Sequence, residues 1–234
     1  MTIGLMQPYF LPYLGYWQLI DTVDEFIIYD DADFSKGGWY NRNNIIVNNK
    51  KHLFTLPVEK AAKSKKINDK VFAKNIKQEK EKVLRKIQQA YAKSPHFEES
   101  YDVLDRIFQY NTQNLVAFNV HAIQSICHSL RISTRISISS SLSLDDNLTG
   151  ADRVIAVCKE KQANKYVNSI GGKSLYNAEM FGLHGISLKF IEMLDICYFQ
   201  HSTNFIPNLS IIDAMFHVGI EETKSLLTQY RLIP

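Results

Sequence analysis

Polar and aromatic side chains gather between Gln7 and Tyr16, directly after a short apolar run. A loop that joins a buried strand to a helix turns backbone N–H groups toward an anion, and Gly15 would let a phosphate approach the backbone closely. Gln7 is the residue least explained by packing, because it interrupts the apolar run where the strand would end. We therefore expect a binding site in this segment, with Gln7, Tyr9, Tyr13, Gly15 and Tyr16 as contacts.

Residues 30–43 combine acidic, basic, amide and aromatic side chains in one stretch. Arg42 would clamp a phosphate or carboxylate with paired hydrogen bonds, and Lys36 would add a point charge. Trp39 would stack on a ring of the ligand. The glycines at 37 and 38 would give this loop the freedom to move as a lid.

A third polar turn runs from Gly171 to Tyr176 and includes Gly172 and Lys173. Glycines followed by Lys-Ser at the start of a helix are typical of turns that bind phosphate. The spacing differs from that of a P-loop, so the turn predicts phosphate contacts without identifying a nucleotide triphosphatase.

No metal or nucleophile signature accompanies these loops. The seven histidines form no HxxxH or HExxH pair, and the three cysteines are too widely spaced for a zinc site or a disulfide framework. We expect no bound metal, and buried thiols in a reducing compartment. No GxSxG sequence is present.

The composition is that of a globular protein, with 45% apolar and 12% aromatic residues in 234. No apolar stretch is long enough to span a membrane, and the N-terminal run lacks the features of a signal peptide. We therefore expect a cytoplasmic protein. The net charge is +3, but residues 59–93 hold 12 Lys or Arg and 4 Asp or Glu, so the rest of the chain is acidic. This asymmetry argues against general nucleic-acid binding through the whole surface.

Strands alternate with helices at both ends of the sequence. Apolar runs predict strands, and helical spacing predicts helices, over these ranges: strands 2–6, 26–29, 135–141, 165–170 and 186–191, and helices 13–21, 153–162, 175–182 and 211–218. The helix from 211 would end at Gly219. This alternation favours an α/β fold with a mainly parallel, Rossmann-like sheet flanked by helices.

The middle of the chain departs from this pattern. We predict two strands over 45–47 and 52–58, then helices over 69–91, 97–110 and 115–130. The sequence thus divides into an N-terminal part of the α/β domain (1–58), a lysine-rich helical insertion (59–131) and a C-terminal part of the α/β domain (132–234).

Taken together, these segments resemble the WbqC-like family. The resemblance spans nearly the whole chain and rests on residues 7–16, 24–30, 39–43, 166, 171–173, 176 and 205–219. Matching positions are Gln7, Tyr9, Arg42, Asn43, Gly171, Gly172, Tyr176 and Asp213. The opening segment also looks like that of nucleotidylyltransferases and class I synthetases, with Tyr13 and Tyr16 near the places of their two histidines.

The resemblance implies an enzyme encoded among bacterial O-antigen (lipopolysaccharide) genes that modifies a nucleotide-linked amino sugar. The reaction would be transfer of an amino acid such as glycine, or of an acyl group, to the sugar amine. Arg42 and Lys36 would hold phosphate, while Gln7 and Asn43 would orient the sugar or nucleotide. Asp30, Asp213 or His201 would act as the catalytic base that deprotonates the amine.

Two other functions stay open: a nucleotidyltransferase acting on a sugar phosphate, and a non-catalytic polysaccharide assembly factor that docks through the lysine-rich helix. The activated group would come from ATP chemistry or an activated amino-acid donor. If aminoacyl-tRNA were that donor, the same helix would bind it. The sequence names no certain cofactor.

Overall fold

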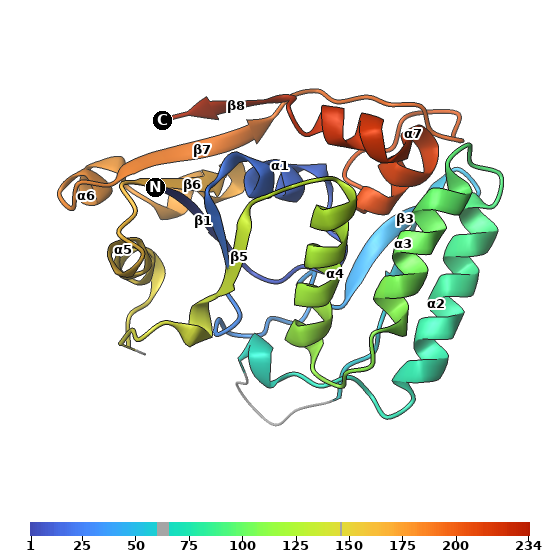
Figure 1. The fold of residues 1–234 in the computed structure, drawn as a ribbon, viewed down its shortest axis with the longest axis horizontal. Coiled ribbons are helices and arrows are strands. Elements are labelled where there is room, and N and C mark those ends of the chain that lie inside the picture. Colours follow the sequence, from blue (N-terminus) through green and yellow to red (C-terminus); the bar gives the residue numbers. More distant parts are fainter. Residues whose placement is uncertain (60–65, 146) are drawn as a thin grey trace.

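The computed structural model describes residues 1–59, 66–145 and 147–234. Its centre is a six-stranded sheet in the order β5-β2-β1-β6-β7-β8 (Figure 1). The strands are β1 (Thr2–Met6), β2 (Glu25–Ile28), β5 (Arg135–Ile138), β6 (Lys165–Ser169), β7 (Ser187–Met193) and β8 (Tyr230–Ile233). All neighbouring pairs are parallel except β7 and β8. The prediction of a mainly parallel, Rossmann-like sheet is confirmed.

The central strands are apolar runs because both of their faces are covered. All four residues of β2 are buried. Successive side chains of a strand point to opposite faces, so Phe26 and Ile28 join one hydrophobic core while Ile27 joins a second.

Helices supply the two covering layers. The core that contains Phe26 includes residues from α1 (Leu14–Thr22), α4 (Leu115–Ser129) and α7 (Ile211–Leu226). The core that contains Ile27 includes residues from α5 (Gly150–Glu160) and α6 (Ala178–Gly182). In the part of the chain that is described, no helix has the length and apolarity that crossing a bilayer requires.

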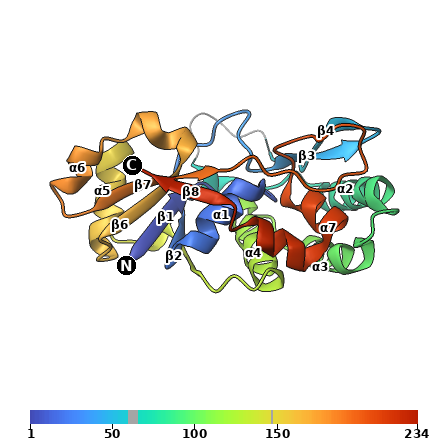
Figure 2. The same cartoon turned by 90° about the horizontal axis from the view of Figure 1, so that it is seen from above.

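The middle of the chain forms a second lobe beside the sheet (Figure 2). The strands β3 (Arg42–Val47) and β4 (Lys50–Thr55) make a separate antiparallel hairpin. The helices α2 (Ile76–Tyr91) and α3 (Phe97–Gln109) follow and share the larger core with α1 and α7. The helix α2 begins later than the predicted residue 69, after a 3₁₀ turn at Ile67–Asp69. Residues 60–65 of the predicted lysine-rich segment lie outside the described residues.

The C-terminal part differs from the prediction at Gly219 and at β8, and the predicted strand 135–141 ends at Ile138. Gly219 has the positive φ of 82° expected of a glycine that ends a helix, but the chain returns to helical torsions and α7 continues to Leu226. The strand β8 was missed, because four partly exposed residues at a sheet edge carry no clear apolar pattern.

Gly219→Ala should lower the free energy of unfolding by about 1–3 kcal/mol, measured by urea denaturation. The left-handed torsion disfavours a side chain, and a Cβ here would lie 2.6 Å from His96 Nδ1. Gly182→Ala is the matched control, because its Cβ would meet nothing within 4 Å. Equal stability of the two variants would contradict this account of the kink.

Candidate functional site

A cleft lies where the strand order reverses, between β1 and β6. The chain continues from β1 to β2 on one side, whereas β6 pairs with the other side of β1. In open α/β sheets, ligands bind beyond the carboxyl ends of the strands at such a point. The cleft has a volume of about 500 Å³ and is lined by Gln7, which follows β1, and by Ser169, which ends β6. Its size is typical of small-molecule sites, which span roughly 300–1,000 Å³.

The structure brings predicted binding residues from three separate segments to this cleft. They are Gln7, Tyr9, Tyr13, Gly15, Tyr16, Trp39, Gly171, Gly172 and Tyr176. Among the other residues that line the cleft, the polar side chains of Tyr29 and Asn168 were not predicted as contacts. Asn168 did carry a signal, because it is a polar residue near the end of an otherwise buried strand, as Gln7 is after β1.

The loop after β1 is held by a buried amide from α4. Asn119 is fully buried, and its Nδ2 donates to the carbonyl oxygens of Pro8, at 2.8 Å, and Tyr40, at 2.7 Å. Because these two carbonyls belong to different lining loops, one side chain fixes both loops relative to each other.

A second buried amide holds the next turn of the same loop. The Nδ2 of Asn43 donates to the carbonyl oxygens of Phe10 and Leu11, at 2.9 and 2.8 Å, and its Oδ1 accepts from the backbone N–H of Asn44. The hydroxyl of Ser210 also donates to the carbonyl of Leu11, which has a positive φ of 45°. The side chain of Asn43 therefore supports the loop and has little capacity left to orient a ligand.

Gln7 presents an unpaired donor to the cleft. Its backbone carbonyl accepts from the Tyr16 hydroxyl at 2.8 Å, and its Oε1 accepts from the Tyr40 hydroxyl at 3.0 Å. Within the described residues, its Nε2 has no hydrogen-bond partner. A ligand in the cleft can therefore accept a hydrogen bond from this amide.

The tyrosines of the loop are neutral phenols. Burial, and then the neighbouring Tyr40 and Tyr13, raise the pKa of Tyr9 to about 12. Burial raises the pKa of Tyr13 and Tyr16 as well. These groups donate or accept hydrogen bonds but do not act as bases at neutral pH. Gly15 leaves space for Tyr13, since a Cβ at Gly15 would lie 2.6 Å from that ring.

The turn after β6 is built around Asn168. A Cβ at Gly172 would lie 2.5 Å from the Nδ2 of Asn168, so the glycine makes room for this amide. The Oδ1 of Asn168 accepts from the N–H of Ser169. Residues 170–175 form a 3₁₀ helix, not the start of the predicted α-helix. Lys173 is exposed and does not line the cleft.

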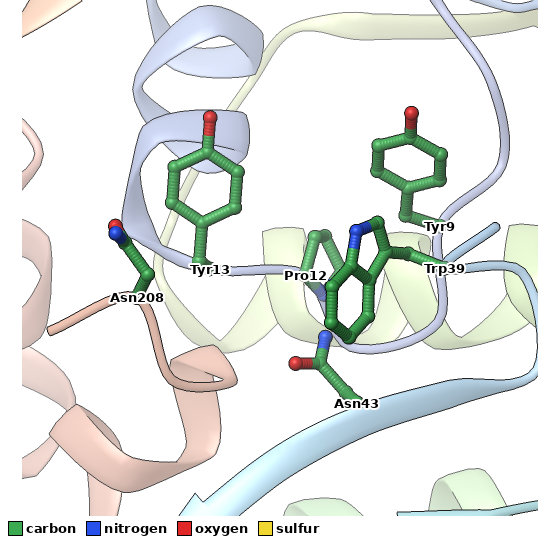
Figure 3. Close-up of a pocket in the computed structure, with 6 residues that line it drawn as sticks. All are labelled: Tyr9, Pro12, Tyr13, Trp39, Asn43 and Asn208. Carbon is green, nitrogen blue, oxygen red and sulfur yellow. The ribbon is translucent and has the colours of Figure 1, made fainter. Parts of the chain in front are cut away.

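A smaller cavity of about 250 Å³ adjoins the cleft and shares Tyr9, Tyr13 and Trp39 with it. Pro12, Asn43 and Asn208 complete its lining (Figure 3). Both phenol rings point the same way from the loop, and Trp39 faces them from the loop after β2 (Figure 3). This aromatic compartment can enclose a planar or sugar ring.

Arg42 braces the loop that carries Trp39. Its guanidinium donates to the carbonyl oxygens of Gly37 and Gly38 and lies over the Trp39 ring, 5.7 Å from its centroid. Neither Arg42 nor the exposed Lys36 lines the cleft or the aromatic compartment. The predicted phosphate contacts of both side chains stay a prediction.

Asp30 lies outside the cleft, in a separate cavity lined also by Asn68 and Ser140. Its carboxylate is buried and accepts from the hydroxyls of Ser139 and Ser140, from the N–H of Ser140 and from the Nδ2 of Asn68. Four hydrogen-bond donors therefore surround the carboxylate of Asp30.

Asp213 and His201 lie elsewhere again. Asp213 is fully buried and accepts from the hydroxyls of Tyr91 and Tyr198, at 2.7 and 2.8 Å, and from the Nε2 of Gln200 at 2.8 Å. His201 is exposed and lines another cavity. The three predicted bases thus occupy three places, and none lines the cleft.

The cleft and the aromatic compartment are electrically neutral. No Asp, Glu, Lys, Arg or His is among the described residues that line them. Nor does any group of three or more His, Cys, Asp or Glu within the described ranges have the arrangement of a metal site. The lining therefore offers a ligand aromatic surface, amides and phenols.

Comparison with known proteins identifies the family of this chain. The profile of the WbqC-like protein family matches residues 7–225, from Gln7 in the cleft to the last turn of α7. The chain belongs to the WbqC-like protein family. A relative from Mycobacterium tuberculosis (strain ATCC 25618 / H37Rv), the uncharacterized protein Rv1507c, is 31% identical over 227 residues, which cover 94% of each chain. No solved structure matches this WbqC-like chain.

Asn119→Ala should destabilise the protein by about 2–4 kcal/mol, because two buried carbonyl groups lose their donor. Urea denaturation followed by tryptophan fluorescence measures the change. The control is Gln124→Ala on the exposed side of the same helix, which should change little. A similar loss in both variants would show that the amide does not hold the two loops.

Alkaline pH should weaken the fold partly through Tyr9. A phenol whose pKa is raised in the folded state stabilises the protein fully below pH 10.0, its ordinary pKa, and loses this contribution as pH rises toward 12. The free energy of unfolding should therefore fall more steeply between these values in the wild type than in Tyr9→Phe, measured by denaturation at a series of pH values. Identical slopes would contradict the raised pKa.

Proposed function

We propose that this protein is an enzyme of bacterial surface-polysaccharide (O-antigen) biosynthesis that binds a nucleotide-linked amino sugar in the cleft. The reaction is transfer of an amino acid such as glycine, or another acyl group, to the sugar amine. The observation that carries the proposal is a neutral, aromatic and amide-lined cleft at the switch point of the sheet.

The lining suits a sugar and a base better than an isolated anion. The amides of Gln7 and Asn168 and the phenols of Tyr9 and Tyr13 match hydroxyl and carbonyl groups of a ligand, and the faces of aromatic rings pack on sugar or base rings. The aromatic compartment supports the proposal by adding room for a second ring.

In the proposed reaction, the sugar nitrogen attacks the acyl carbon and a C–N bond forms. The bond to the leaving group breaks, and the leaving group takes the electron pair. The proton lost by the nitrogen passes to the leaving group or to water. Because a raised pKa keeps Tyr9 protonated, its hydroxyl can donate to the developing oxyanion. The chain's contribution would then be mainly positioning of the two reactants.

The catalytic base stays a proposal. Of the three candidates, His201 is the exposed one, and it lies on the same loop as Asn208, which lines the aromatic compartment. The activated donor would be an ATP-derived or tRNA-linked amino acid.

The neutral lining favours one rival function, a polysaccharide assembly factor that binds the sugar without reacting. The same observation disfavours a nucleotidyltransferase, because transfer at a triphosphate needs cationic groups that offset its charge. An assay that measures binding and product formation separately distinguishes the assembly factor from the proposed enzyme.

Gln7→Leu should weaken binding of a uridine diphosphate amino sugar about tenfold, measured by calorimetry, because the ligand loses an amide donor. Gln88→Leu, a remote exposed glutamine, is the control and should bind normally. Mass spectrometry of a reaction with activated glycine should show an amide-linked sugar. Binding without product would favour the assembly factor, and no binding by folded wild type would overturn the proposal.

A further inference from the structure

A second polar cavity lies at the far end of the β3–β4 hairpin. The residue Asn43 of β3 lines the aromatic compartment, whereas Ile46 and Val47 of the same strand line this other cavity. We call it the hairpin cavity. It measures about 460 Å³ and is completed by the hairpin turn, by α2 and by two histidines. Figure 2 shows the hairpin lying beside α2 and α7.

The charge in the hairpin cavity is positive. Lys86 lines it, and no Asp or Glu is among its described lining residues. The Lys86 Nζ lies 2.8 Å from the Nε2 of His52, which must accept because an ammonium only donates. In the described ranges no carboxylate lies within ion-pair distance of Lys86. Lys50 and Lys51 follow the turn and are exposed, so they add positive potential nearby.

His217 forms a fixed, neutral wall. Its Nε2 accepts from the backbone N–H of His201 at 3.1 Å, so its Nδ1 carries the hydrogen and donates to the carbonyl oxygen of Asp213 at 2.8 Å. The ring of His201 packs edge-on against His217, with 5.2 Å between centroids, and is exposed. The carboxylate of Asp213 lies beneath this wall, fully buried, and accepts from Tyr91 and Tyr198.

Amide groups complete the donor set. Asn48 and Asn49 form the hairpin turn with positive φ values of 50° and 61°. Within the described part of the chain, their side chains and that of Gln89 have no hydrogen-bond partners. Three amides and an ammonium around one cavity, with no acid among its lining residues, match a ligand that is anionic and rich in acceptors.

We propose that the hairpin cavity binds the phosphate group of a small phosphorylated ligand. Lys86 supplies the counter-charge, and Asn48, Asn49 and Gln89 donate to the phosphate oxygens. No cation is among the described residues that line the cleft at β1 and β6, so we expect an isolated phosphate to bind in the hairpin cavity and not in the cleft. None of the four side chains proposed to bind phosphate lines the cleft, although His201, a candidate base of the proposed function, also lines the hairpin cavity.

Calorimetric titration with inorganic phosphate and with glucose 1-phosphate tests the proposal. Lys86→Gln should weaken the binding of both at least tenfold. Lys77→Gln, an exposed lysine of the same helix outside the cavity, should bind as the wild type does. In NMR spectra, phosphate should shift the ring resonances of His201 and His217, and Gln7→Leu should leave phosphate binding unchanged.

Titration with a short single-stranded RNA tests whether the phosphate group comes from a nucleic-acid backbone instead of a small ligand. RNA binding that depends steeply on salt and that Lys86→Gln and Lys77→Gln weaken equally would overturn the proposal. In that case the lysines around the hairpin cavity and along α2 would act as a diffuse surface for polyanions. Absence of phosphate binding at millimolar concentration by the folded wild type, or equal affinity in Lys86→Gln and Lys77→Gln, would also overturn it.

Discussion

The loop after β1 turns several of its carbonyl groups toward the protein interior, and each must find a donor there, because a buried carbonyl without one costs free energy comparable to a lost hydrogen bond. Asn119 and Asn43 provide these donors for Pro8, Phe10 and Leu11. With the backbone fixed from inside, the side chains of the same loop are free to face the cleft. The β3–β4 hairpin and α4 each contribute one of these amides, so both elements are hydrogen-bonded to the same loop.

Most of the fold could be predicted because it depends on periodicity. The buried strands are unbroken apolar runs, and the helices repeat apolar residues at helical spacing. The features that were not predicted have little signal in the local sequence pattern. The strand β8 depends on pairing with β7, and Gly219 has the torsion of a helix end although packing of the next turn extends the helix. Tertiary contacts decide both.

The candidate site was predictable where a polar residue interrupts an apolar run, as Gln7 does. It was less predictable where a residue's role depends on a distant partner. The sequence predicts that Arg42 binds phosphate, yet its guanidinium donates to carbonyl oxygens of its own loop. Asn119 lies within a helix whose pattern predicts only burial, and nothing nearby indicates that it reaches two separate loops. Such long-range hydrogen bonds leave no trace in local spacing.

The order of the strands in the sheet also bears on how the protein folds during synthesis. The cleft lies between β1 and β6, and Thr2 of β1 pairs with Lys165 of β6. The ribosome therefore makes one wall of the cleft long before the other, and the N–H and C=O groups on this edge of β1 have no strand partner until β6 is made. Non-local parallel pairing of this kind is slow and leaves strand edges exposed in the meantime. The candidate cleft therefore cannot form until β6 has been made, after β1, β2 and β5 and before β7 and β8.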